Sequence, residues 1–550
     1  MKRILIFLIA VVALSTSCKK YLDDAYKNPN LPTYSPPEQV LQSCISAMHR
    51  GIAFDSRNIG FYTQNFAQIT GVNQWERHGY LLSAGSANNG SDIYRMHYWN
   101  MGYNLIDMID SSRITGKFDY IAAAYSLNAW SWVTAADVYA EMPVKQAFER
   151  GRLSFDYDNQ NVAYELALKY CDSALANWAN AAAMTKPSTL SQGDLWFFQG
   201  NQSRWIKFVN GIKARIYHRY SKKSSYLTKE ADSVIKYTNL AMSSTADDAM
   251  IQFNMAFPDV TARNFFGPSR NNVGGFRIGA FPVNIMTGSA ATPGGVFGNV
   301  VNDPRVRYMM RPSPNGTYNG VIAGQFTDNT STPAASDKRV PSFWGTLAQT
   351  TAPALGVDTG ARTFFRNDSK FPIMTYSEMQ FLSAEAYFRK GDLANARTAY
   401  INGINGHFDM LNTHFYGYLN AVGTNSPTVM TNVPISASDR AAYLADPTFV
   451  PLSSGLTLKH IMCQKYLALW GWGFVENWVD MRRYDYDEIN IYPTYKRLDI
   501  ISLFPDNGGK LAQRIRPRYD SEYLWNGDAL RIVGGFDQDY HTKKVWFSLP

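Results

Sequence analysis

Residues 379–400 read Met-Gln-Phe-Leu-Ser-Ala-Glu-Ala-Tyr-Phe-Arg-Lys-Gly-Asp-Leu-Ala-Asn-Ala-Arg-Thr-Ala-Tyr, a stretch typical of two helices joined by a tight turn. Gly391 stands where the first helix should end, because glycine adopts the left-handed conformation that closes many helices. Small side chains such as Ala384 and Ala396 would let the two helices approach each other closely. The stretch therefore predicts a packed helix pair.

The same stretch is similar to the tetratricopeptide pattern at Ala384, Tyr387, Phe388, Gly391, Ala396 and Tyr400. A regular solenoid shows at least three copies of its repeat, and this is the one clear copy in the sequence. We therefore expect tetratricopeptide-like helix pairs embedded in one globular domain rather than a repeat array.

Helical periodicity extends on both sides of this pair. Apolar residues at positions 163, 167, 170, 171, 174, 175 and 178, and again at 205, 208, 209, 212 and 216, follow the spacing of one buried helical face. Further helices are expected at 38–50, 94–111, 121–136 and 229–243. The predicted fold class is mainly α, helical over 38–250 and 375–484 within a domain spanning 38–550.

Residues 251–371 interrupt this helical pattern. Proline, glycine, asparagine, serine and threonine cluster there, as in Gly267-Pro-Ser-Arg-Asn-Asn272. A long irregular insertion in a compact protein is usually functional. We therefore expect this loop-rich segment to be functional.

The composition narrows the class of partner. The 550 residues include 31 Phe, 34 Tyr and 13 Trp, together 14% aromatic and more than a core usually needs, so some rings should lie on the surface. The net charge is only +8, and basic residues come in pairs such as Lys222-Lys223 rather than in runs. Nucleic-acid binding needs several cations together, so we expect no nucleic-acid partner.

The N-terminus has the pattern of a targeting signal. Lys2-Arg3 precedes eleven apolar residues, Ile4 to Leu14, which suit a signal peptide but are too few to span a bilayer as a helix. Ser15-Thr-Ser-Cys18 resembles a bacterial lipobox, so residues 1–17 would be removed and Cys18 lipidated; a plain secretory signal is the alternative. Residues 18–37 would be an extended tether, leaving a soluble chain held to a membrane by lipid. Cys171 and Cys463 should be buried small hydrophobes.

Sequence signatures of catalysis are missing. The chain has no H-E-x-x-H, G-x-S-x-G or Gly-rich phosphate-binding motif, and its eight histidines lack metal-ligand spacing. We expect no catalytic residue or cofactor and identify no metal-binding residues, while the presence of a structural calcium stays open. Glycosidase carboxylates leave no short motif, so Glu76, Asp137 and Glu141 stay open as candidates. The pairs Asp137/Glu141 and Glu476/Asp480 are better explained as helix ends and structural ion pairs.

Several segments, in order along the chain, together resemble the SusD/RagB family of Bacteroidetes outer-membrane lipoproteins. They are Ser17–Asp23, Ala136–Pro143 (like D-x-Y-G-x-I-P, with Ala140 in place of Gly), Trp205–Arg215 (like W-x-K-F-x-N-x-x-x-x-R), Asp303-Pro304-Arg305, Pro372–Glu378 running on to Ala384-Glu385-Ala386, and Gln464-Lys465-Tyr466 leading to Trp478–Arg483. The resemblance covers the chain from Cys18 to about residue 490.

This resemblance implies about four tetratricopeptide-like helix pairs and a loop-rich ligand-binding face. Family members lie on the cell exterior, pair with a TonB-dependent SusC-like barrel transporter, and capture glycans, or peptides in some branches, without covalent chemistry. The motif residues are implied to be scaffold, with Arg482 and Arg483 pairing with buried carboxylates.

The ligand site is predicted from the chemistry of sugars, which favour an aromatic platform beside amide and guanidinium groups. Two places offer this mixture. One is the stretch 73–80, with Asn73, Trp75, Arg77 and Tyr80; the other is the irregular middle, with Arg270, Asn271, Tyr308 and Trp344. Stacking and packing remain equally open for Trp75, whereas packing is favoured for Trp344. Tyr94, Tyr98 and Trp99 have helical spacing and are expected in the core.

The sequence thus predicts a lipid-anchored, glycan-binding subunit of an outer-membrane import complex. The alternatives are a lipid-anchored glycoside hydrolase, a peptide-binding uptake subunit, and a tetratricopeptide-type scaffold for another protein. The identity, linkage and length of the ligand stay open at this point.

Overall fold

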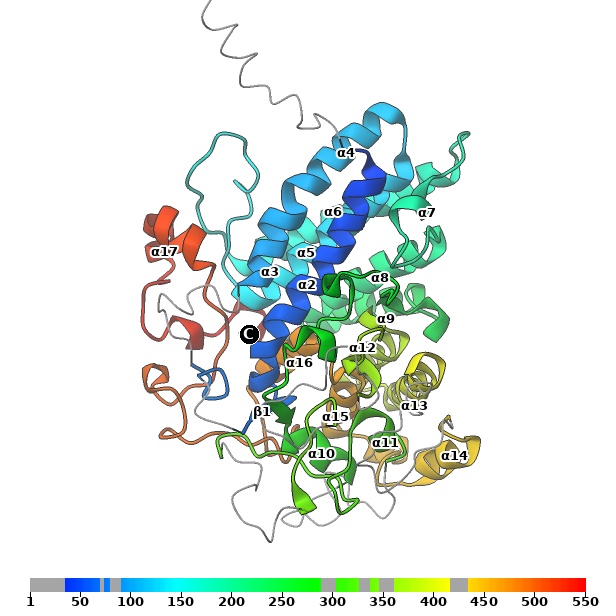
Figure 1. Cartoon of the computed structure of the whole chain (residues 1–550), viewed down its shortest axis with the longest axis vertical. Helices are drawn as coiled ribbons and strands as arrows, with labels where there is room; N and C mark the ends of the chain where they lie inside the picture. The colour runs from blue at the N-terminus through cyan, green and yellow to red at the C-terminus, as the bar shows by residue number, and fades with distance from the viewer. Residues whose placement is uncertain are drawn as a thin grey trace, which may run out of the picture.

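The computed structural model describes residues 35–69, 74–79, 91–287, 303–325, 337–345, 361–415 and 434–550. Helices dominate it, and the predicted mainly α fold is confirmed (Figure 1). The α-helices are α2 (Pro37–Tyr62), α3 (Asp92–Arg95), α4 (Tyr103–Thr115), α5 (Phe118–Tyr139), α6 (Gln160–Ala182), α7 (Leu190–Gly193), α8 (Gln202–Arg219), α9 (Ala231–Leu240), α10 (Ala280–Thr287), α11 (Val306–Met309), α12 (Tyr376–Arg389), α13 (Leu393–Met410), α14 (Ala437–Ala445), α15 (Leu458–Leu469), α16 (Phe474–Arg483) and α17 (Gly527–Ile532).

Consecutive helices pack as pairs. The most extensive contacts join α5 to α6, α12 to α13 and α8 to α9, and α15 contacts α16. Figure 1 shows α8, α9, α12 and α13 side by side along one flank, with the C-terminal segment and α17 on the opposite flank. This is the arrangement of tetratricopeptide-like helix pairs that the stretch 379–400 predicts.

The pair α12–α13 shows why that stretch folds as it does. The Thr375 side chain accepts the N–H of Glu378 and so caps the start of α12, and Asp392 caps α13 in the same way through Asn395. Gly391 has a φ of 80° and ends the first helix as expected. A Cβ atom at Gly403 would lie 2.8 Å from the Phe381 ring, so the close approach of the two helices requires glycine there.

The strands are short and lie at the base of the irregular middle. β2 (Ala249–Ile251) pairs antiparallel with β4 (Phe371–Met374), with Ala249 opposite Met374. This pairing joins the two ends of the 251–371 segment. β1 (Phe66–Gln68) pairs antiparallel with β3 (Phe276–Ile278), with Phe66 opposite Ile278, and so attaches the segment to the end of α2.

One motif residue departs from the preferred backbone. Ala140, which stands where the related motif has glycine, has φ 64° and ψ −106° at the end of α5. Such a conformation costs a side-chain-bearing residue on the order of 1–3 kcal/mol. The turn therefore keeps a glycine-type geometry although its residue is alanine.

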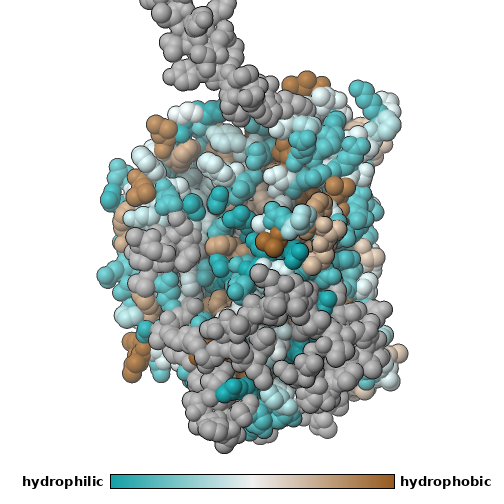
Figure 2. Space-filling view, viewed as in Figure 1, coloured by the Kyte–Doolittle hydropathy of each residue, from teal (hydrophilic) through white to brown (hydrophobic). Residues whose placement is uncertain are grey.

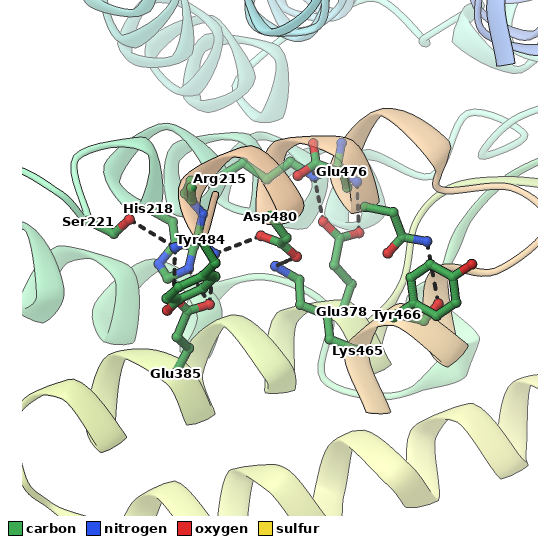
Figure 3. A network of polar contacts seen from close by, with 12 residues as sticks. Arg215, His218, Ser221, Glu378, Glu385, Lys465, Tyr466, Glu476, Asp480 and Tyr484 are labelled. Atoms are coloured by element: carbon green, nitrogen blue, oxygen red, sulfur yellow. Dashed lines mark hydrogen bonds and ion pairs between the residues drawn. The ribbon is translucent and has the colours of Figure 1, made fainter. Parts of the chain in front are cut away.

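Buried charged side chains join five helices at the centre of the fold, and Figure 3 shows the part of this network that links α8, α12, α15 and α16. Arg219 of α8 lies 2.7 Å from Asp137 of α5 and 2.7 Å from Glu476 of α16. Arg215, one helical turn earlier, lies 2.6 Å from Glu378 of α12. These side chains are almost fully buried, so each charge depends on its partner rather than on water.

Arg483 is the second centre of this network. Its guanidinium lies 2.6 Å from Glu385 of α12 and 2.6 Å from Asp480, which also receives Lys465 of α15 at 2.8 Å. Although burial opposes ionisation of the Glu385 carboxyl, Arg483 and His218 hold its pKa well below the usual range. The expected pairing of Arg483 with buried carboxylates is confirmed.

Arg482 behaves differently from its neighbour. Its guanidinium stacks 3.7 Å above the Trp478 ring and donates to the backbone oxygen of Gln513. The expectation that Arg482 pairs with a carboxylate is wrong, because adjacent residues on a helix point about 100° apart and Arg482 faces the C-terminal segment instead.

Arg483→Met should destabilise the protein strongly, because it leaves the Glu385 and Asp480 carboxylates buried with too little compensating charge. Removing one partner of a buried pair costs roughly 3–5 kcal/mol. The measurement is the midpoint of urea unfolding. Arg531→Met is the matched control, since Arg531 pairs with Asp528 at the surface. Equal midpoints for the two variants would contradict a structural role for the network.

Candidate ligand-binding site

The stretch 74–79 serves as an anchor in the structure. Trp75 is only 4% exposed, and its ring packs 5.8 Å from that of Tyr62. Arg77 donates to the backbone oxygens of Ser502 and Leu503, each at 2.8 Å, and ties the stretch to the C-terminal segment. Of the two roles left open for Trp75, stacking on a ligand and packing in the core, the structure supports packing. Asn73 and Tyr80 lie outside the described residues.

The rings predicted in the irregular middle are also packed. Trp344 is 2% exposed, and its indole N–H donates to the backbone oxygen of Phe266 at 2.9 Å. Tyr308 is fully buried and accepts a hydrogen bond from Arg307. Because a sugar needs an exposed ring face, neither ring can serve as a platform in this conformation. Arg270 and Asn271 differ, since both remain accessible to solvent.

The candidate carboxylates of the hydrolase alternative have structural partners. Asp137 pairs with Arg219 in the buried network, and Glu141 pairs with Arg514. Glu76 is 1% exposed and accepts the backbone N–H groups of Gln68 and Gly324, each at 3.2 Å. Glu476 and Asp480 belong to the network as well, so the structural interpretation of both i, i+4 pairs is confirmed.

The prediction that Trp99 lies in the core is wrong. The segment Met96–Gly102 between α3 and α4 is a π-helix, a wide turn often found at functional sites. His97 packs inward, with its ring 4.2 Å from that of Trp132 on α5. Tyr94 is buried and Tyr98 half-buried, as expected, but Trp99 is 75% exposed because it follows the inward-facing residues on the outer side of this turn.

Trp99 lines a cavity of about 520 Å³ that sequence reasoning did not find. We call it the aromatic cavity. It lies among the end of α3, the π-helical turn, the segment 143–155 and the C-terminal residues 518–522. Its lining includes Tyr94, Tyr98, Trp99, Tyr103, Phe148 and Phe155. Rings from segments far apart in sequence meet here, so no local motif signals the site.

The aromatic cavity combines ring faces with polar groups. The Tyr98 hydroxyl donates to the backbone oxygen of Pro143 at 2.5 Å, and Tyr103 packs edge-on to Phe148 at 5.4 Å. Arg95, Arg518 and Asp520 add guanidinium and carboxylate groups to the lining. Mainly apolar walls with a few polar groups are typical of small-molecule sites, and exposed rings with hydrogen-bonding neighbours suit the two faces of a sugar.

Backbone hydrogen bonds position this cavity from the core. The Asp55 carboxylate of α2 accepts the N–H groups of Asp92 and Ile93, the first residues of α3. The Tyr139 hydroxyl of α5 accepts the N–H of Tyr94 at 3.0 Å and donates to Asp55. Two long helices thus hold the short segment that carries Trp99. Figure 2 shows hydrophilic residues gathered over α2 and α3 on this face of the molecule.

Other kinds of site are not found in the described part of the chain. No group of three or more His, Cys, Asp or Glu side chains in those residues could hold a metal ion. Nor does any helix there have the length and apolar character needed to cross a membrane. Cys171 and Cys463 are buried and unpaired, as expected, and burial raises the pKa of both thiols.

The buried carboxyl group of Glu76 should make the stability of the fold depend on pH. Burial raises the pKa of its carboxyl from 4.5 to about 7, against the opposing effect of the two backbone N–H groups. The folded chain therefore favours the neutral carboxyl, which adds roughly 3 kcal/mol to the free energy of unfolding below pH 4.5. This contribution is lost as the pH rises through 7. The melting temperature of Glu76→Gln, relative to the unsubstituted chain, should rise between pH 5 and pH 8. The surface variant Glu149→Gln is the control, and a pH-independent difference for Glu76→Gln would contradict the assignment.

Comparison with known proteins places the chain in a family. The family model described as starch-binding and associating with the outer membrane, SusD-like, matches residues 29–501. A SusD/RagB family protein from Bacteroides thetaiotaomicron has a similar structure, with a TM-score of 0.69, 20% identity, and coverage of 94% of this chain and 99% of that one. A chitin-binding SusD homologue from Flavobacterium johnsoniae gives a TM-score of 0.63 at 17% identity, with coverage of 93% and 98%. No curated protein matches the sequence. With its family model matched over most of its length and its helix pairs arranged as expected, the chain belongs to the SusD-like family.

Proposed function

We propose that this protein is a surface-exposed lipoprotein that binds a glycan in the aromatic cavity and passes it to a TonB-dependent, SusC-like transporter in the outer membrane. The observation that carries the proposal is Trp99, a tryptophan with three quarters of its surface exposed at the edge of a cavity lined by five further rings. Family membership and the chitin-binding homologues of the same fold support a carbohydrate ligand.

Binding would rest on stacking and hydrogen bonding. The flat C–H face of a sugar ring would lie on the Trp99 indole, while Arg95, Asp520 and the Tyr103 hydroxyl would bond its hydroxyl groups. The cavity is open to one side and holds only a few sugar residues, so the rest of a longer chain would extend beyond it. Capture of this kind needs no covalent step.

The hydrolase alternative has lost its candidates. Each carboxylate that the sequence offered is committed to a buried arginine or to backbone N–H groups, which leaves no acid–base couple facing the aromatic cavity among them. We therefore propose a binding protein rather than an enzyme. Because a peptide ligand would use the same rings, every binding assay should also include peptides.

The membrane half of the proposal rests on the signal and lipobox at residues 1–18, which lie outside the described residues, and on the family's association with the outer membrane. Lipid at Cys18 and the tether to residue 37 would hold the domain above the barrel. A tagged, lipidated chain that copurifies with no outer-membrane barrel from its own host would contradict this half.

Trp99→Ala should weaken glycan binding at least tenfold, about 1.4 kcal/mol, because it removes the exposed stacking face. Trp525→Ala is the matched control: Trp525 is 77% exposed but does not line the aromatic cavity. Titration calorimetry on the soluble chain, with an oligosaccharide that it retains, measures both. Equal affinities for the two variants would place the ligand elsewhere.

A further inference from the structure

A second cavity, of about 530 Å³, lies between the N-terminal half of α2, Trp196 and the start of the irregular middle. One wall is a polar stripe on the N-terminal half of α2, where Gln39, Ser43, Ser46 and Arg50 recur at helical spacing. The opposite wall comes from the start of the irregular middle and includes Arg270. We call it the arginine cavity.

The two arginines have unused hydrogen-bonding capacity. Arg50 is exposed, and the one acceptor for Arg270 among the described residues is the backbone oxygen of Thr261 at 3.2 Å, while its guanidinium lies over the Phe265 ring. Within the described residues, neither guanidinium forms an ion pair with a carboxylate. Since a guanidinium carries five N–H donors, most of those in the cavity are free to bind a ligand.

The potential in this cavity is positive. Burial and then repulsion from Arg50 lower the pKa of Arg270, and the exposed carboxylate of Asp259 opposes this only in part. Asp259 also accepts the N–H of Thr261, which fixes it in the loop. His49 adds no charge, because burial lowers its pKa to about 3. Two cations face this space and no carboxylate is among the described residues that line it, which favours an oxyanion there.

The rim of the cavity is suited to a sugar. The rings of Trp196 and Phe257 meet edge-on at 6.1 Å, and Phe257 is 49% exposed. The amide side chains of Gln39 and Asn254 also line the cavity. A stacking face, amide groups and two guanidinium groups together match a pyranose ring that bears an acidic substituent.

We infer that the arginine cavity binds the acidic group of an anionic sugar, a uronate carboxylate or a sulfate ester, so that the glycan captured by this protein is an acidic one. This inference rests on the proposed function and specifies its ligand class. Arg50 and Arg270 bind the oxyanion, and Trp196 and Phe257 stack on the ring that carries it.

Arginines that line the two cavities interact with the same carboxylate. The Asp92 carboxylate at the start of α3 interacts with Arg50 of the arginine cavity and with Arg95 and Arg518 of the aromatic cavity. The arginine cavity is lined by α2 and the aromatic cavity by α3, and these two helices contact each other. One branched or extended glycan can present a neutral residue to Trp99 and an acidic residue to the arginines.

The test compares acidic oligosaccharides with their own neutral forms. Soluble chain lacking residues 1–18 is titrated with oligogalacturonate, glucuronoxylan and alginate oligosaccharides, with the carboxyl-reduced form of each, and with a sulfated and a desulfated galactan. We expect at least one acidic member to bind tenfold or more tightly than its neutral counterpart. Arg50→Gln and Arg270→Gln should each abolish that preference, and Arg531→Gln, a surface arginine outside both cavities, should keep it.

The outcomes separate the two claims. A preference for a sulfated over a uronate ligand supports the inference and identifies the anion. Neutral glycans that bind in a Trp99-dependent way, with no preference for any acidic form, overturn the inference alone. A preference that survives the Arg50→Gln, Arg270→Gln double variant overturns it as well. Failure of every glycan to bind overturns the proposed function together with the inference.

Discussion

Charges buried where five helices meet constrain the whole molecule. Arg219 and Arg483 each lie between carboxylates from different helices, with no water to replace a missing partner. Such networks add little net stability compared with an apolar core, but any single missing partner is costly. The network therefore fixes how the helices pack, because all the charges are paired only when α5, α8, α12, α15 and α16 meet in one arrangement.

That requirement extends to the surface through α5. Asp137, near the end of α5, belongs to the network, and Tyr139, two residues later, bonds to Asp55 and to the first turn of α3. The π-helical turn follows directly and presents Trp99 to solvent. A rigid scaffold thus ends in a short segment that carries the proposed stacking face, and motif residues such as Asp137 and Tyr139 support the site from the core.

The sequence predicted those parts of the molecule that depend on local patterns. Helical periodicity, the turn at Gly391 and the small residues of α12 and α13 read directly as a helix pair, and motif order identified the family. The ring platforms could not be predicted in this way. Trp75 has polar neighbours in sequence, yet a tertiary partner, Tyr62, packs against its ring and buries it. Trp344, for which the sequence favoured packing, is buried and donates to the Phe266 carbonyl group. Trp99 lies beside core residues, and only the wide π-helical turn, which apolar spacing does not reveal, sets it on the surface.

The central claim is capture without cleavage, and one experiment tests it most directly. Soluble protein lacking residues 1–18 is incubated with a panel of polysaccharides, oligosaccharides and peptides, and retention and product release are followed in the same samples. The account predicts that one class of glycan is retained and recovered intact. New reducing ends would contradict it and restore an enzymatic function, and retention of peptides alone would assign the aromatic cavity to a different ligand.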